Sequence, residues 1–152
     1  PGDDFAGSEL QKLQGQVPPI GQLNFDLDAE TAHQQLTQKA IRKNLLESAH
    51  DLSEGGLGVA LAEALFDSSL GFEGRTSLTN AQLFSETQSR FIVSVDAENQ
   101  AKFEALAGNQ AVLLGHTTDQ DQVSLTTADG ELKASCADLK ATFGGALGCL
   151  MK

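Results

Sequence analysis

The residues of this chain best suited to chemistry lie in one short stretch, Ser48–Leu57. It combines His50, two carboxylates, a serine hydroxyl and the adjacent glycines Gly55 and Gly56. A glycine pair at the start of a helix lets the backbone come close to a ligand, and the first amide N–H groups of the helix can then bind an anion. The stretch therefore offers amides for a phosphate, and the Asp51 carboxylate for a divalent metal or a polar ligand group.

The same residues also suit an ordinary helix start. Ser53 can act as the N-cap, Glu54 suits the positive end of the helix dipole, and the glycines can close a strand-to-helix turn. A glycine pair at a helix start is a weak motif, and the Lys and Ser/Thr of a phosphate-binding P-loop are missing from it. His50 has no Cys or Ser in a nucleophile setting beside it, so a structural role is favoured over acid–base catalysis. The residues alone leave both interpretations open.

A second polar stretch, Phe84–Phe91, precedes the clearest strand pattern of the chain. Its Arg90 can bind an anion or form an ion pair with Glu86, and the ion pair is the favoured interpretation. His116 is predicted at the end of a strand and His33 within a polar helix. Both imidazoles are therefore expected to be exposed to solvent.

Length and composition indicate one globular domain with a real core. The chain has 152 residues, 40% hydrophobic and 20% charged, with a formal net charge of −11. Such an acidic chain repels nucleic-acid backbones and anionic lipid, and no apolar run approaches the ~20 residues that span a bilayer. Cys136 and Cys149 fit no metal-ligand spacing and indicate reduced thiols in a cytosolic protein. The sequence thus predicts no nucleic-acid partner, no membrane partner and no metal site.

Local patterns predict the helices and strands that position these residues. Apolar spacing and capping residues predict helices over 29–46, 56–69, 80–84, 97–106 and 136–143, and alternation predicts strands over 47–51, 75–78, 90–95, 111–117, 122–127 and 131–134. Asp28 is expected to cap the first of these helices and Asp96 the fourth. The strands 111–117 and 122–127 are expected to pair as a hairpin, and Asp129-Gly130 to turn into the next strand.

This order of elements predicts an α+β fold, with a mixed or antiparallel sheet and helices packed on one face. Near the N-terminus, Ser8 can cap a short helical turn that ends by Gln14, and Pro18-Pro19 then break the structure. Residues 1–21 are therefore predicted to be a linker with a short helical turn, and residues 22–152 to be the domain.

Several blocks, in order along almost the whole chain, resemble the formylglycinamide ribonucleotide amidotransferase family, also called phosphoribosylformylglycinamidine synthase. The glycine motif and the helix after it look like the family's C-terminal segment, and the polar stretch before the clearest strand looks like a second block. Three shorter blocks resemble the end of the linking region, a strand-end glycine motif and the C-terminal tail. The blocks are residues 48–63, 83–93, 7–10, 114–117 and 144–150.

The resemblance implies the C-terminal domain of the short bacterial large subunit, subunit II, with a fold like the C-terminal domain of aminoimidazole ribonucleotide synthetase. Because the chain starts at Pro1 rather than Met, we expect a piece of a longer protein. The family is a cytoplasmic ligase of purine biosynthesis. It converts formylglycinamide ribonucleotide, glutamine and ATP to formylglycinamidine ribonucleotide, ADP, phosphate and glutamate. The implied cofactors are ATP and Mg²⁺ in the full enzyme, with none bound tightly to the fragment.

The resemblance also implies partners and site residues. The partners are the preceding domains of the same chain, a glutaminase subunit that supplies ammonia, and a small third subunit. The family's catalytic His and most metal-binding acids lie in N-terminal domains, so His50 should not inherit a catalytic role and no catalytic or metal residue is expected here. The ligand- or phosphate-binding candidates that match the family motifs are Asp51, Ser53, Gly55, Gly56 and Arg90.

Two functions follow as hypotheses. The chain is either a ligand-contacting part of the ligase, inactive as an isolated fragment, or a packing domain that binds no ligand in the same or a related ATP-binding synthetase. Separated from its neighbours, it is expected to expose apolar surface and therefore to self-associate.

Overall fold

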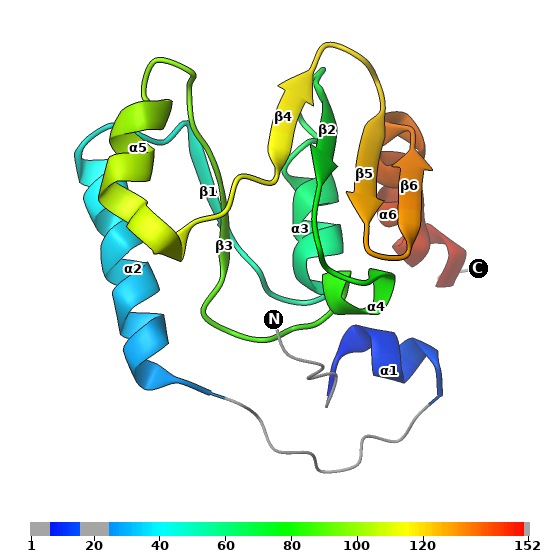
Figure 1. Cartoon of the computed structure of the whole chain (residues 1–152). Coiled ribbons are helices and arrows are strands. Elements are labelled where there is room, and N and C mark those ends of the chain that lie inside the picture. The colour runs from blue at the N-terminus through cyan, green and yellow to red at the C-terminus, as the bar shows by residue number, and fades with distance from the viewer. Residues whose placement is uncertain (1–6, 16–24, 151–152) are drawn as a thin grey trace. The chain divides into compact units, whose positions relative to one another are not determined.

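The computed structural model describes residues 7–15 and 25–150 (Figure 1), with side chains up to residue 145. The chain divides into two compact units. The first unit comprises the described residues up to Ala60 together with Phe84–Leu113. The second comprises Leu61–Leu83 and the described residues from Leu114 onward. All the candidate site residues belong to the first unit.

The elements alternate irregularly, as the sequence pattern predicts. In chain order they are α1 (Glu9–Leu13), α2 (Leu27–Arg42), β1 (Ser48–Asp51), α3 (Gly56–Glu63), β2 (Gly71–Arg75), α4 (Asn80–Leu83), β3 (Phe91–Ser94), α5 (Gln100–Ala107), the 3₁₀ turn η1 (Gly108–Gln110), β4 (Gly115–Thr118), β5 (Val123–Thr127), β6 (Gly130–Ala134) and α6 (Cys136–Leu150).

Each unit contains one sheet. In the first unit β1 pairs antiparallel with β3, from Ser48 opposite Ser94 to Asp51 opposite Phe91. In the second unit the strand order is β4-β2-β5-β6, where β2 and β5 are parallel and the other neighbours antiparallel. The predicted α+β class with a mixed sheet is therefore confirmed.

The strand arrangement of the second unit corrects two expectations. The hairpin between 111–117 and 122–127 is wrong, because β2 lies between β4 and β5. The strand predicted at 75–78 instead occupies Gly71–Arg75. A Cβ on Gly71 would lie 2.0 Å from the carbonyl oxygen of Gln120, so this glycine allows a neighbouring backbone to approach closely.

Several predicted boundaries also shift. Asp26, rather than Asp28, caps α2, and its Oδ1 accepts the amides of Asp28 and Ala29 at 3.0 Å each. The helix predicted over 56–69 ends at Glu63, and the one predicted from Ala97 begins at Gln100. The strand predicted from residue 111 begins at Gly115, and the preceding Val112 is 90% exposed.

Other local predictions are confirmed. Ser8 caps α1, where its Oγ accepts the Gln11 amide, and the pattern around Phe91 forms the strand β3. The predicted β5–β6 hairpin forms, although its turn residues are Ala128 and Asp129 and Gly130 is already the first residue of β6. The predicted break at Pro18-Pro19 lies outside the described residues, and the division into a linker and a domain at residue 21 stays a prediction.

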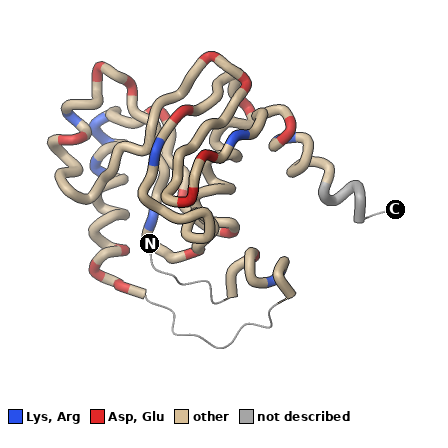
Figure 2. Tube along the Cα trace, turned by 45° about the vertical axis from the view of Figure 1, so that its right-hand side comes forward, with Lys and Arg blue, Asp and Glu red and all other residues tan. Residues whose placement is uncertain are grey.

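The core of each unit is mainly aliphatic. In the first unit it includes Ala40, Leu45, Leu52, Ala60 and Ala107, each under 9% exposed. Acidic residues are spread along the described trace of the chain, and basic residues are fewer (Figure 2). In the described part of the chain, no helix is long and apolar enough to cross a membrane.

Candidate ligand-binding turn

The glycine turn, which we define as residues Asp51–Gly56, connects strand β1 to helix α3. The Leu52 amide donates to the carbonyl oxygen of Arg90 at 2.9 Å and so continues the β1–β3 pairing beyond Asp51. The Leu52 side chain is buried, at 8% exposed, and anchors the turn in the core of the first unit. The chain then reverses, and the Gly56 amide closes the turn by donating to the carbonyl oxygen of Ser53 at 3.1 Å.

The two glycines of the turn are required by their backbone conformation. Gly55 has φ 77° and Gly56 has φ 61°, which is the left-handed region where a Cβ is unfavourable. A Cβ on Gly55 would also lie 2.3 Å from Cγ2 of Val59, one turn further along α3. The glycine pair is therefore explained by local geometry, with or without a ligand.

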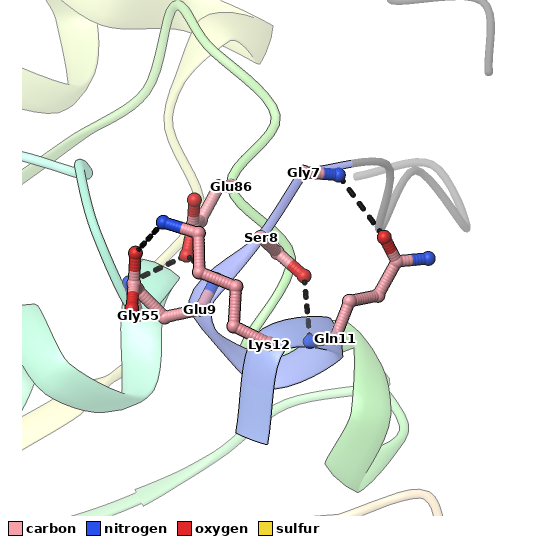
Figure 3. A network of polar contacts seen from close by, with 7 residues as sticks. All are labelled: Gly7, Ser8, Glu9, Gln11, Lys12, Gly55 and Glu86. Atoms are coloured by element: carbon pink, nitrogen blue, oxygen red, sulfur yellow. Dashed lines mark hydrogen bonds and ion pairs between the residues drawn. The ribbon is translucent and has the colours of Figure 1, made fainter. Parts of the chain in front are cut away.

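Glu86 supplies an anion to the backbone of this turn. Its Oε1 accepts the Gly55 amide at 3.0 Å and also the Glu9 amide, at the start of α1, at 2.8 Å (Figure 3). A carboxylate thus accepts the Gly55 amide, which was one of the candidate donors to a phosphate. Glu86 was not among the candidate site residues, because no local pattern connects it to Gly55 or Glu9.

Arg90 stabilises the loop before β3. Its Nε donates to the carbonyl oxygen of Thr87 at 2.8 Å and its Nη2 to that of Ser85, while burial lowers the pKa of the guanidinium. The expected ion pair between Arg90 and Glu86 is therefore wrong. Each charge is instead satisfied by backbone groups.

The histidines lie in different settings. His33, expected to be exposed, is half-buried, and its Nδ1 lies 2.7 Å from the carbonyl oxygen of Ser89. Because Ser89 has φ 68°, this contact holds the loop in an uncommon conformation. His50 lies on β1 with its Nδ1 within hydrogen-bond distance of the Asp51 carbonyl oxygen. His116 is exposed on β4, as expected.

The candidate residues differ in how open they are. The side chains of Asp51 and Ser53 are exposed, whereas Gly55 and Gly56 are buried and Arg90 is half-buried. The turn brings together the four candidates of residues 51–56, and the backbone hydrogen bond from Leu52 to Arg90 places Arg90 beside them. The outer side of the turn therefore carries the polar groups that an external molecule can reach.

The described residues do not fit ATP or Mg²⁺ as they are arranged. The Gly55 and Gly56 amides already donate within the protein, and a phosphate at Gly55 would first have to displace the Glu86 carboxylate. Among the described side chains, residues 7–15 and 25–145, no group of three or more His, Cys, Asp or Glu is placed to hold a metal ion.

Cys136 is a free, buried thiol at the start of α6. Its Sγ lies 3.6 Å from the carbonyl oxygen of Leu70. Burial, and to a lesser degree the nearby Asp121, raises the pKa of this thiol. A thiol held protonated is a poor nucleophile, which fits a structural role.

The fold and the glycine turn together define the class to which the chain belongs. Residues 14–128 match the family model described as AIR synthase related protein, C-terminal domain, and the chain belongs to this family. The resemblance predicted from the sequence blocks is thus confirmed, and the relatives identify the particular branch of the family.

The chain is similar to the PurL subunit of phosphoribosylformylglycinamidine synthase. It is 50% identical, over 150 residues, to the PurL subunit of Lacticaseibacillus casei. This match covers 97% of this chain and 20% of that relative. Structures of Thermotoga maritima proteins share the fold. The one described as PurLQS has a TM-score of 0.67 and 17% identity over 89% of this chain and 24% of the other. The structure of PurL complexed with ATP has a TM-score of 0.60 and 15% identity, and the match covers 71% of this chain and 21% of the other. The chain therefore spans about a fifth of the curated relative's length.

Proposed function

We propose that this chain is the C-terminal domain of an ATP-dependent, amidine-forming ligase of purine biosynthesis. The ligase would convert formylglycinamide ribonucleotide, ATP and glutamine-derived ammonia to formylglycinamidine ribonucleotide, ADP and phosphate. The observation that carries the proposal is the 50% identity, over 97% of this chain, to a phosphoribosylformylglycinamidine synthase subunit. The isolated chain is expected to be inactive, because it spans a fifth of that relative and its described residues assemble no catalytic group.

Within the whole protein, we assign the candidate residues two roles. Asp51 and Ser53 are exposed and would contact a ligand or a neighbouring domain directly. Gly55, Gly56 and Arg90 would shape the turn, since their hydrogen-bonding groups are used within the protein. These three residues would contact a ligand only if the ligand replaced their present hydrogen-bond partners.

The cofactors and partners belong to the same proposal. ATP, supported by the relative solved with ATP, and Mg²⁺ would act in the full enzyme, outside the residues described here. The preceding domains, a glutaminase subunit and a small third subunit would be the partners, which the relative described as PurLQS supports. The enzyme would work in the cytoplasm, and the isolated chain would self-associate through apolar surface such as Val112 and Leu113, which are 90% and 61% exposed.

A chimeric enzyme tests the proposal. The segment of the Lacticaseibacillus casei subunit that aligns with this chain would be replaced by this chain, and amidine formation measured with the partner subunits. We expect turnover within about tenfold of the parent enzyme and none from the 152-residue chain alone. A folded chimera without activity, or turnover by the chain alone, would contradict the proposal.

The second hypothesis, a packing domain without ligand contact, is favoured by the internal use of the Gly55 amide. Asp51→Ala and Ser53→Ala in the active chimera separate the two hypotheses, with the exposed Asp119→Ala as the matched control. Loss of activity or nucleotide binding in the first two variants alone supports ligand contact. Activity equal to the control in all three supports the packing role.

A further inference from the structure

The carboxylate of Glu86 connects two segments that lie far apart in the sequence. A single oxygen, Oε1, accepts the amide of Glu9 at 2.8 Å and the amide of Gly55 at 3.0 Å (Figure 3). Hydrogen bonds from backbone amides to a charged carboxylate are among the stronger ones in proteins. Glu86 therefore holds the first residue of α1 and the glycine turn at one point.

Other features of α1 show that its start is firmly placed. Ser8, its N-cap, is 2% exposed, and the Ser8 Oγ accepts the Gln11 amide at 3.3 Å. Lys12 forms an ion pair with Glu9 on the same helix. The pKa of Lys12 is raised, chiefly by Glu9 and more weakly by the acidic groups of Glu54 and Glu86. The electrostatic influence of Glu54 and Glu86 on Lys12 is favourable, and its ion pair is with Glu9.

We propose that Glu86 is a latch that couples the docking of α1 to the conformation of the glycine turn. Ordering the Glu86 side chain has an entropy cost, and the bonds to Glu9 and Gly55 share it. When one bond is lost, the other has to hold the side chain alone and becomes weaker. The N-terminal segment of residues 7–15 thereby controls how rigidly the turn that carries Asp51 and Ser53 is held. The latch does not depend on the proposed enzymatic role.

The position of Glu9 allows a specific test. It is the first residue of α1, where proline is well tolerated, and the preceding Ser8 has ψ 156°, which suits a residue before proline. Glu9→Pro therefore preserves the helix and replaces the N–H donor with the ring Cδ, which also displaces the Glu86 oxygen from this position. Glu9→Ala is the matched control, because it removes the side chain and its ion pair with Lys12 but keeps the N–H.

The measurement is amide hydrogen exchange on the 152-residue chain, resolved to single residues. Glu86→Ala should accelerate exchange of the Glu9 and Gly55 amides about tenfold or more, and Glu86→Gln to a smaller extent. Glu9→Pro should accelerate exchange at Gly55 about threefold or more, because Glu86 loses the bond that shared its ordering cost and is displaced by the proline ring. Glu9→Ala should leave Gly55 unchanged.

Two results would overturn the latch. The first is unchanged exchange at Gly55 in Glu9→Pro, which would show that α1 and the turn are independent. The second is equal acceleration in Glu9→Pro and Glu9→Ala, which would assign the effect to the Glu9 side chain. If Glu86→Ala does not fold, Glu86→Gln together with Glu9→Pro and Glu9→Ala still decides whether Glu86 couples α1 to the turn. Failure of the chimeric enzyme would not affect this readout, so the latch and the enzymatic proposal can fail separately.

Discussion

Replacing Gly55 with alanine tests the geometry of the glycine turn directly. Two separate costs are expected. The backbone at φ 77° is unfavourable for any residue with a Cβ, which costs about 1–2 kcal/mol. The new Cβ would also lie 2.3 Å from Cγ2 and 2.8 Å from Cβ of Val59, and relieving such overpacking costs about 1–3 kcal/mol.

The expected loss for Gly55→Ala is therefore about 2–5 kcal/mol in the free energy of unfolding. Val59 gives way only with difficulty, because a β-branched side chain has few rotamers on a helix. Val59→Ala removes Cγ2, the closest atom, and leaves the contact at 2.8 Å, so it should relieve part of the overpacking. By itself, Val59→Ala should cost about 1 kcal/mol, since it removes half-buried methyl groups.

The assay is urea unfolding followed by circular dichroism for the parent, the two single variants and the double variant. The double variant should be more stable than the sum of the single effects predicts, by about 1 kcal/mol or more. Additivity within about 0.5 kcal/mol would refute the steric part of the reasoning and leave only the backbone cost. A loss below about 1 kcal/mol for Gly55→Ala would refute the backbone cost as well.

Four further outcomes are expected. Gly115→Val on β4 would place a Cβ 2.2 Å from the carbonyl oxygen of Glu73. The free energy of unfolding should fall by about 3 kcal/mol or more, seen as a lower melting temperature, and an unchanged melting temperature would contradict the close approach of β4 to β2. Gly144→Ala on α6 meets no atom within 4 Å and should stabilise the chain by about 0.5–1 kcal/mol, so a lowered melting temperature would count against an open helix surface there. Arg90→Lys cannot reproduce the forked donation to two carbonyl oxygens and should cost about 1–3 kcal/mol in urea unfolding, and a neutral effect would show that these bonds contribute little. The pKa of Cys136 is raised in the folded chain, so the unfolded chain loses the thiol proton first, and the free energy of unfolding should fall as the pH rises above about 8.5. Cys136→Ala should flatten that fall, and an identical pH profile in this variant would show that Cys136 is not the group responsible.

Local signals were enough for much of the fold. The cap at Ser8, the alternation that forms β3 and the β5–β6 hairpin each depend on a few neighbouring residues. The first two are confirmed, and the hairpin forms with its turn one residue earlier than predicted, at Ala128-Asp129. The helix start at Asp26 was missed because Asp28 caps equally well by type, and only the backbone geometry selects between them. Strand β2 was displaced because its glycines are typical of turns, although Gly71 serves close approach of a neighbouring backbone.

The candidate site was less accessible to sequence reasoning. The glycine pair marked the turn correctly, and both residues adopt the left-handed conformation that glycine permits. The partner of the Gly55 amide could not be inferred, because Glu86 lies 31 positions away and pairs through a backbone group that carries no sequence signature. The same reason explains the wrong pairing of Arg90 with Glu86, since both side chains bind backbone atoms.

The sequence by itself determined the family, the α+β class and the position of the glycine turn, because these depend on residue types and on short-range spacing. Only the tertiary structure decided what the turn does with its amides. Folding brings Glu9, Gly55 and Glu86 to one point, where a buried amide needs an acceptor and the Glu86 carboxylate supplies it. The stretch that looked most like a phosphate site therefore carries its own internal anion, and Asp51 and Ser53 are the candidate side chains left open to another molecule.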